Sequence, residues 1–156
     1  MKELENDELY DEWEDEEKIP IDWDSLTKDS YISLVKFAYQ NPGAILMIGF
    51  DEHTFDYETT DWKTLFSKYP ISDWLTTNEE KEFYNKLPKQ ITVYRTATED
   101  NKDGISYTTN KLVANYFLTE SDYYKNKDAQ IYTKTINKTD IRAILLDMDE
   151  DEIILI

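Results

Sequence analysis

The chain has 156 residues and a mass of 18.6 kDa, which suits one ordinary domain and leaves little room for a second. It has no cysteine, so disulfides, thiolate catalysis and Cys-ligated zinc are excluded. No apolar run approaches the length of a membrane span, and the start MKELENDELY lacks the apolar core of a signal peptide. These features predict a cytoplasmic globular protein that does not enter a membrane.

The charge of the chain is strongly negative, with 34 Asp and Glu against 17 Lys and Arg, a net charge of −17. Direct binding of nucleic acid is not expected, because Lys and Arg supply most of that affinity. Such acidity can keep a protein soluble, or it can present carboxylates to a basic partner as a nucleic-acid mimic does. Ten of the acids lie in residues 1–18. We expect this segment to be a flexible acidic tail and residues 19–156 to form one domain.

The first part of that domain, residues 19–90, is expected to be mainly helical. Apolar positions near helical spacing predict a helix over residues 30–39. Two shorter helices are expected, capped by Asp61 and Asn78. The apolar run 44–48 is too short for its period to distinguish a helix turn from a strand.

After residue 90 the apolar period changes from 3.6 to 2, which predicts strands. The expected strands are residues 91–96, 105–109, 130–136, 141–146 and 152–156. Asn110 is expected to cap a helix whose inner stripe is Leu112, Val113, Tyr116 and Phe117. The predicted fold is α+β: helices first, then a mostly antiparallel sheet with one helix crossing it.

Arg95 breaks the pattern of the first strand. It follows Ile91 and Val93 on the inward face, so a guanidinium ends an apolar stripe. A half-buried arginine needs an anionic partner, either a carboxylate of the protein or a phosphate of a ligand. The two alternatives have equal weight at this point.

Two glutamates near the end of the chain are candidate working acids. Glu150 and Glu152 are two residues apart, so an extended segment would place both on one face. Neighbouring aspartates should raise some of the carboxyl pKa values, although a solvated acidic turn is the plainer alternative. The spacing does not follow an EF-hand. His53, the only histidine, has no second ligand near it in the sequence, so no metal site is expected.

Three stretches carry the clearest resemblance to a known family: ITVYRTA, GISYTTNKLVANYF and DIRAILLDMDEDEIIL. In this order they contain Arg95, Ser106 and the Glu150-x-Glu152 pair. The order resembles the NAD-dependent mono-ADP-ribosyltransferases of the Arg-Ser-Glu type, and most of all their small phage and bacterial members. The resemblance covers residues 91–156. It implies an ADP-ribosyltransferase-like fold, NAD as substrate and a host protein as acceptor, with arginine a candidate acceptor side chain.

The resemblance also assigns roles to individual residues. Arg95 matches the arginine that contacts the phosphates and the nicotinamide ribose of NAD. Ser106 matches the serine that positions the catalytic glutamate, and Glu152 matches that glutamate, which stabilises the oxocarbenium-like transition state. Glu150 matches the upstream glutamate that orients an acceptor guanidinium. Further contacts with NAD would come from Tyr107, Thr108 and Phe117.

A second hypothesis belongs to a different class of protein. The chain would then be a non-catalytic acidic inhibitor, or a nucleic-acid mimic, on the same fold, and would block a basic host protein. The complete set of Arg95, Ser106 and the two glutamates favours the enzyme. The charge of −17 and the acidic residues 1–18 favour the inhibitor.

Overall fold

The computed structural model describes the backbone of residues 20–21, 25–41, 47–48, 53–54 and 61–156, and the side chains of residues 25–41 and 61–156. The expected acidic tail, residues 1–18, lies outside the described residues. The chain divides into two compact units, Met1–Trp62 and Lys63–Ile156. This division differs from the expected single domain over residues 19–156. None of the helices in the described part of the chain is long and apolar enough to cross a membrane.

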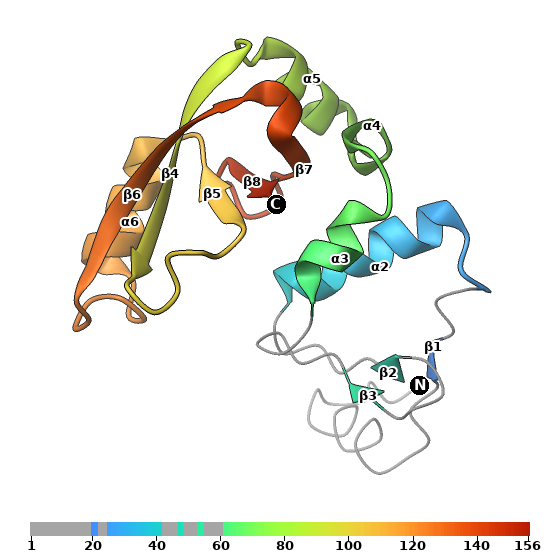
Figure 1. Cartoon of the computed structure of the whole chain (residues 1–156), viewed down its shortest axis with the longest axis horizontal. Helices are drawn as coiled ribbons and strands as arrows, with labels where there is room; N and C mark the ends of the chain where they lie inside the picture. The colour runs from blue at the N-terminus through green and yellow to red at the C-terminus, as the bar shows by residue number, and fades with distance from the viewer. Residues whose placement is uncertain (1–19, 22–24, 42–46, 49–52, 55–60) are drawn as a thin grey trace, which may run out of the picture. The chain divides into compact units, whose positions relative to one another are not determined.

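The first unit contains one long helix and a small sheet (Figure 1). These elements are α2 (Lys28–Gln40), β1 (Pro20–Ile21), β2 (Met47–Ile48) and β3 (His53–Thr54). The strands are ordered β1-β2-β3, with β1 parallel and β3 antiparallel to β2. The side chain of Thr27 caps α2 by accepting a hydrogen bond from the Ser30 backbone N–H at 3.2 Å. The predicted helix over 30–39 is confirmed, and the unassigned run 44–48 ends in a strand.

Three short helices precede the main sheet. They are α3 (Trp62–Ser67), α4 (Ile71–Trp74) and α5 (Asn78–Lys86). The prediction that Asn78 caps the last of these was wrong. Thr77 is the N-cap: its hydroxyl accepts from the Glu80 backbone N–H at 3.1 Å, and the Glu80 carboxylate accepts from the Thr77 backbone N–H at 3.3 Å. This reciprocal capping box satisfies two backbone donors, which a single Asn cap would not. Helix α4 was not predicted, because four residues show no period.

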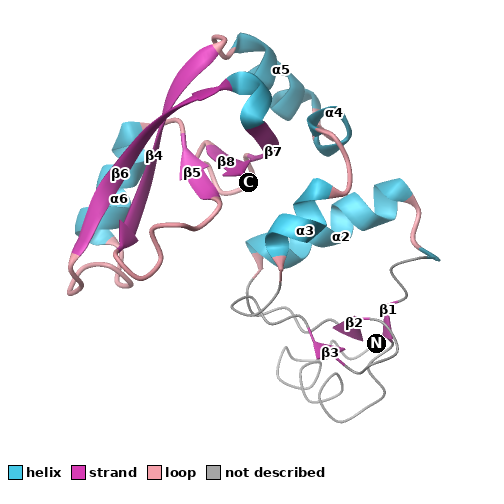
Figure 2. Ribbon diagram, viewed as in Figure 1, coloured by secondary structure: helices cyan, strands magenta, loops and turns pink. Residues whose placement is uncertain are grey.

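The second unit is built on a five-stranded sheet (Figure 2). Its strands are β4 (Gln90–Thr98), β5 (Ser106–Thr108), β6 (Ala129–Asn137), β7 (Ile141–Leu145) and β8 (Glu152–Leu155). Their order is β6-β4-β5-β8-β7, and every neighbouring pair is antiparallel. A 3-10 turn, Lys138–Asp140, joins β6 to β7. The predicted α+β class, with helices before an antiparallel sheet, is confirmed.

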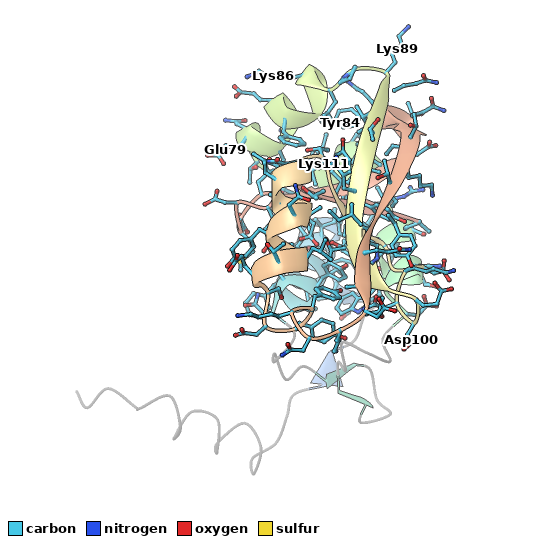
Figure 3. The ribbon with its side chains drawn as sticks, turned by 90° about the vertical axis from the view of Figure 1, so that its left-hand side faces the viewer. Glu79, Tyr84, Lys86, Lys89, Asp100 and Lys111 are labelled. Atoms are coloured by element: carbon cyan, nitrogen blue, oxygen red, sulfur yellow. The ribbon has the colours of Figure 1, made fainter. Side chains whose placement is uncertain are left out.

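The longest strand pair crosses the whole unit. β4 pairs with β6 over nine residues, from Gln90 opposite Asn137 to Thr98 opposite Ala129. Figure 3 shows Lys89 and Asp100 at the two ends of β4. The alternation of β4 buries Ile91 and Val93 on one face, where α4 and α5 contribute further apolar side chains. This core contains Ile91, Val93, Ile136, Ile141, Ile144, Ile153 and Leu155.

Helix α6 (Lys111–Glu120) covers the other face of β4, and Asn110 caps it as predicted, accepting from the Leu112 backbone N–H at 3.0 Å. The predicted inner stripe was partly wrong, since Leu112 is 75% and Tyr116 60% exposed. Ala114 is the fully buried residue, and its carbonyl accepts from the Thr96 hydroxyl at 2.6 Å. A small residue lets the helix backbone approach the strand closely, and this contact turns Leu112 and Tyr116 towards solvent.

Candidate functional site

Glu152 is the central carboxylate of the candidate site. It is the first residue of β8, and the register places it opposite Thr108 of β5. Its carboxylate accepts a hydrogen bond from the Ser106 hydroxyl. Ser106 lies two residues before Thr108 in β5, so its side chain is on the same face of the sheet as those of Thr108 and Glu152. Burial raises the pKa of Glu152 to about 7. The Ser106 hydrogen bond and the Arg95 charge oppose this rise, and the Glu150 charge adds to it.

Arg95 of β4 contacts Ser106 through the backbone, and all three of its hydrogen bonds are to backbone carbonyl oxygens. Its Nη1 donates to the Ser106 carbonyl at 2.8 Å. Its Nη2 and Nε donate to the Asn101 carbonyl at 2.8 and 3.3 Å. Within residues 25–41 and 61–156, no carboxylate lies within ion-pair distance of this guanidinium. A guanidinium has five N–H donors, so two remain for another acceptor.

The absence of an ion pair bears on the two alternatives left open by the sequence. Among the described residues the protein supplies carbonyls to Arg95 and no carboxylate. A carbonyl accepts a hydrogen bond but does not neutralise the guanidinium charge. Arg95 therefore has no carboxylate within ion-pair distance among the described residues, which favours an anionic ligand as its partner.

The strand register places the Arg95 side chain and the Ser106–Glu152 pair on opposite faces of the sheet. Tyr94 pairs with Thr108, and paired residues share a face, so Arg95 leaves β4 on the opposite face, with Val93. Its long side chain reaches β5 at the Ser106 backbone. Thr96, the next residue, lies under α6 and hydrogen-bonds its backbone, so it is directed away from the guanidinium.

The acidic turn 147–151 is fastened to the end of β5. The Thr108 hydroxyl donates to the Glu150 carbonyl at 2.7 Å, and the Asn110 amide donates to the Asp151 carboxylate at 3.4 Å. Asp149 and Asp151 have left-handed backbones, with φ of 54° and 46°, a conformation that short polar side chains tolerate best. These bonds fix where Glu150 stands relative to Glu152.

The prediction that Glu150 and Glu152 share one extended segment was wrong. Strand β8 begins only at Glu152, and the two left-handed residues on either side of Glu150 turn the chain. Glu150 is half-buried, and burial raises the pKa of its carboxyl. Its position depends on the turn, which period-2 alternation cannot describe.

The two aromatic residues assigned to NAD contacts lie apart from the Ser106–Glu152 hydrogen bond. Tyr107 packs against the hydrophobic core on the other face of β5. Phe117 is half-buried on α6, where its ring meets that of Tyr116 edge-on at 6.0 Å between centroids. The contacts of both rings are with other residues, so their roles at NAD stay predictions.

Sequence reasoning missed the residues that hold Arg95. The Asn101 backbone carbonyl accepts two hydrogen bonds from the Arg95 guanidinium. Gly104 has no side chain, and the guanidinium occupies the space that a Cβ atom would need there. The dipeptide Asp103-Gly104 predicted a turn after β4. Nothing in the sequence indicates that this turn would contact Arg95, which lies earlier in the chain, within β4.

The described residues contain no group of three or more acids or histidines arranged to hold a metal ion. The chemistry available at the site is that of a buried carboxylate, a serine hydroxyl, a guanidinium and a second carboxylate. No protein family, no curated protein and no solved structure matches this chain.

Proposed function

We propose that the protein is a mono-ADP-ribosyltransferase that moves ADP-ribose from NAD to an arginine of a host protein, as a phage or bacterial effector would. The observation that carries this proposal is the arrangement of Arg95, Ser106 and Glu152. They come from three adjacent strands and are joined through Ser106, whose carbonyl binds the arginine and whose hydroxyl binds the glutamate. Ser106 thus holds both a guanidinium and a buried carboxylate. The guanidinium suits the phosphates of NAD, and the carboxylate suits the positive charge that develops on its ribose.

Arg95 is the group that fits the pyrophosphate of NAD. Its charge is not neutralised by a carboxylate within the described residues, and two of its N–H donors are free. A guanidinium binds two phosphate oxygens in parallel, with charge-assisted hydrogen bonds that are about twice as strong as neutral ones. Thr96 does not obstruct this path, because its hydroxyl is bonded to α6.

Glu152 is the group that stabilises the transition state. The bond between ribose C1′ and the nicotinamide nitrogen breaks, and its electron pair leaves with nicotinamide. Positive charge then develops on the ribose, and a preorganised carboxylate beside it is favoured in the transition state over the ground state. Glycosidases place carboxylates beside similar cations. The Ser106 hydroxyl holds the carboxylate in one orientation.

Glu150 is assigned to the acceptor. As C1′ forms a bond to a guanidinium nitrogen of the acceptor arginine, that nitrogen releases a proton to solvent, so atoms and charge balance. A carboxylate beside the acceptor orients the guanidinium and favours loss of the proton. Glu150 is half-buried and held by the Thr108 hydrogen bond to its carbonyl, so it stands at a defined place.

The test is to incubate the purified full-length protein with NAD and measure nicotinamide release, with and without lysate of a bacterial host. We expect slow release by the protein alone and faster release with lysate, together with labelling of a lysate protein by radioactive ADP-ribose. Absence of release in both conditions defeats the proposal.

The second candidate, an acidic inhibitor of a basic host protein, rests on the net charge of −17. Exposed charges act over about 8–10 Å at moderate salt, so an inhibitor of this kind should lose its partner as salt is raised. Capture of a basic protein that salt releases, without nicotinamide release, would favour this candidate over the enzyme.

A further inference from the structure

The turn between β4 and β5 contacts the Arg95 side chain at two residues, Asn101 and Gly104. The Asn101 carbonyl accepts three hydrogen bonds, two from the Arg95 guanidinium and one from the Gly104 backbone N–H at 3.2 Å. Arg95 thus lies along the inside of residues 98–104. The Ser106 carbonyl, at the start of β5, accepts a further hydrogen bond from the guanidinium, so Arg95 is held by the turn and by the strand that follows it.

Gly104 is the residue that makes room for the guanidinium. A Cβ atom at this position would overlap the Arg95 carbon Cζ and Nη2, and would lie 3.0 Å from Nη1. The Gly104 backbone is not left-handed, so other residues could adopt its conformation. The need for glycine here comes from the space that Arg95 occupies and not from backbone strain.

The Asn101 side chain fixes the shape of the turn. Its Oδ1 accepts from the Thr98 backbone N–H at 2.8 Å and from the Thr98 hydroxyl at 3.3 Å. Its Nδ2 donates to the Tyr124 hydroxyl at 3.4 Å, which joins the turn to the segment before β6. The carbonyl that accepts from Arg95 is therefore positioned by the amide of the same residue.

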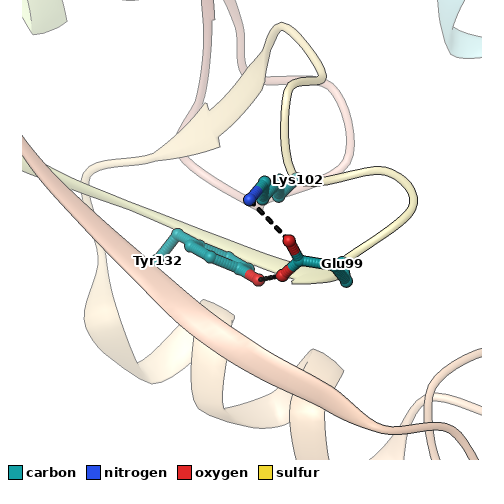
Figure 4. Close-up of polar contacts among 3 residues, drawn as sticks. All are labelled: Glu99, Lys102 and Tyr132. Carbon is teal, nitrogen blue, oxygen red and sulfur yellow. Dashed lines mark hydrogen bonds and ion pairs between the residues drawn. The ribbon is translucent and has the colours of Figure 1, made fainter.

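A second set of contacts closes the outside of the turn (Figure 4). Lys102 forms an ion pair with Glu99 at 2.7 Å, and the Tyr132 hydroxyl donates to the other oxygen of Glu99 at 3.4 Å. The hydrogen bond and charge of Lys102 lower the pKa of the Glu99 carboxyl. Both carboxylate oxygens of Glu99 have partners other than Arg95, so Glu99 does not form an ion pair with the guanidinium.

We propose that residues 98–104 form an arginine clamp, in which Asn101 and Gly104 are positioning residues that hold the Arg95 guanidinium with two N–H donors free for an anionic ligand. The existence of the clamp follows from the contacts alone. Its use for the pyrophosphate of NAD rests on the proposed function. The clamp fixes the guanidinium before the ligand arrives, which reduces the entropy lost on binding.

The chain offers a direct spectroscopic probe, because Arg95 and Arg142 are its only arginines. In the full-length, ¹⁵N-labelled protein their side chains give two Nε–Hε signals, and Arg95→Lys assigns them by removing one. We expect Gly104→Ala to shift the Arg95 signal and to speed exchange of its Hε with water at least tenfold. The Arg142 signal should stay in place and serve as the internal control.

Asn101→Ala is the second variant, since it keeps the backbone carbonyl and removes only the amide that positions it. It should produce the same changes in the Arg95 signal, with melting temperature and spectral dispersion showing that the protein is folded. Asn115→Ala, an exposed asparagine on α6, is the matched control and should leave the Arg95 signal unchanged. An Arg95 signal that is unmoved in both Gly104→Ala and Asn101→Ala overturns the clamp.

Titration with NAD separates this inference from the proposed function. If both hold, Gly104→Ala and Asn101→Ala should weaken NAD binding tenfold or more, and Asn115→Ala should not. If the wild-type protein does not bind NAD, the proposed function fails, and the two spectroscopic comparisons still decide whether the clamp exists. NAD binding that is equally tight in wild type and both clamp variants contradicts the proposed use of the clamp.

Discussion

The two units of the chain differ sharply in charge. Met1–Trp62 has 18 acidic and four basic residues, a net charge of −14, whereas Lys63–Ile156 has 16 acidic and 13 basic residues, a net charge of −3. The candidate site lies entirely in the second unit. The acidity of the whole chain is thus a property of one unit, and the unit that bears the site is close to neutral.

The net charge of the whole chain is therefore a weak guide to whether the candidate site can bind an anion such as NAD. A charge of −17 on one surface would repel an anionic dinucleotide, but exposed charges are screened beyond about 8 Å at physiological ionic strength. Local groups then decide binding, and at the site these include the unneutralised Arg95. The two hypotheses therefore concern different parts of the chain: the NAD chemistry belongs to the second unit, and a basic partner would bind the first.

The largest expected effect comes from Glu152→Gln, which tests the second unit directly. The amide keeps the shape of the side chain and a hydrogen bond with Ser106 but loses the charge that faces the ribosyl cation. Nicotinamide release should fall about 10²- to 10³-fold. A variant that releases nicotinamide at the wild-type rate contradicts the enzyme.

The same substitution should change stability in the opposite direction. Because burial raises the pKa of Glu152 from 4.5 to about 7, the folded protein binds this proton more tightly than the unfolded chain does. Stability from this group is complete below pH 4.5, falls as pH rises to 7, and is lost above it, by about 3 kcal/mol. Glu152→Gln should therefore melt roughly 5–10 °C higher than wild type at pH 8.

Calorimetry of wild type and Glu152→Gln at pH 4.5 and pH 8 checks this expectation. The two proteins should melt at similar temperatures at pH 4.5, where the wild-type carboxyl is already largely protonated in the folded state. A difference in melting temperature that is the same at both pH values would show that the buried charge is not its cause.

Glu150→Ala should separate transfer from hydrolysis. This residue is assigned to the acceptor, so labelling of a lysate protein should fall about tenfold while nicotinamide release with NAD alone changes less than about twofold. Measuring both products in one reaction gives the ratio directly. Equal loss of both would instead place Glu150 at NAD.

The smallest expected effect is in the acidic unit. Deleting residues 1–18 removes ten acids and two lysines, but few apolar side chains. The melting temperature should change by less than about 2 °C, and the KM for NAD by less than about threefold at physiological salt. Loss of biological effect with catalysis intact would assign the tail to partner binding, and a large drop in melting temperature would show that it packs on the protein.

The sequence alone predicted those helices and strands whose formation depends on neighbouring residues. Alternation from Ile91 predicted β4, and Asn110 marked the start of α6, because strand period and helix caps depend on neighbouring residues only. The α+β class followed from the change of period after residue 90.

Features that depend on packing were decided by the tertiary structure. A period of 3.6 shows which residues share a face of α6, but it does not show which face packs against the sheet. In the folded chain the face with Ala114 packs on β4, where the Ala114 carbonyl accepts a hydrogen bond from Thr96. Left-handed residues on either side of Glu150 ended the strand pattern there. The clamp on Arg95 needs a carbonyl and a gap, which any residue and any glycine can provide, so only the folded chain brings Asn101 and Gly104 to the arginine.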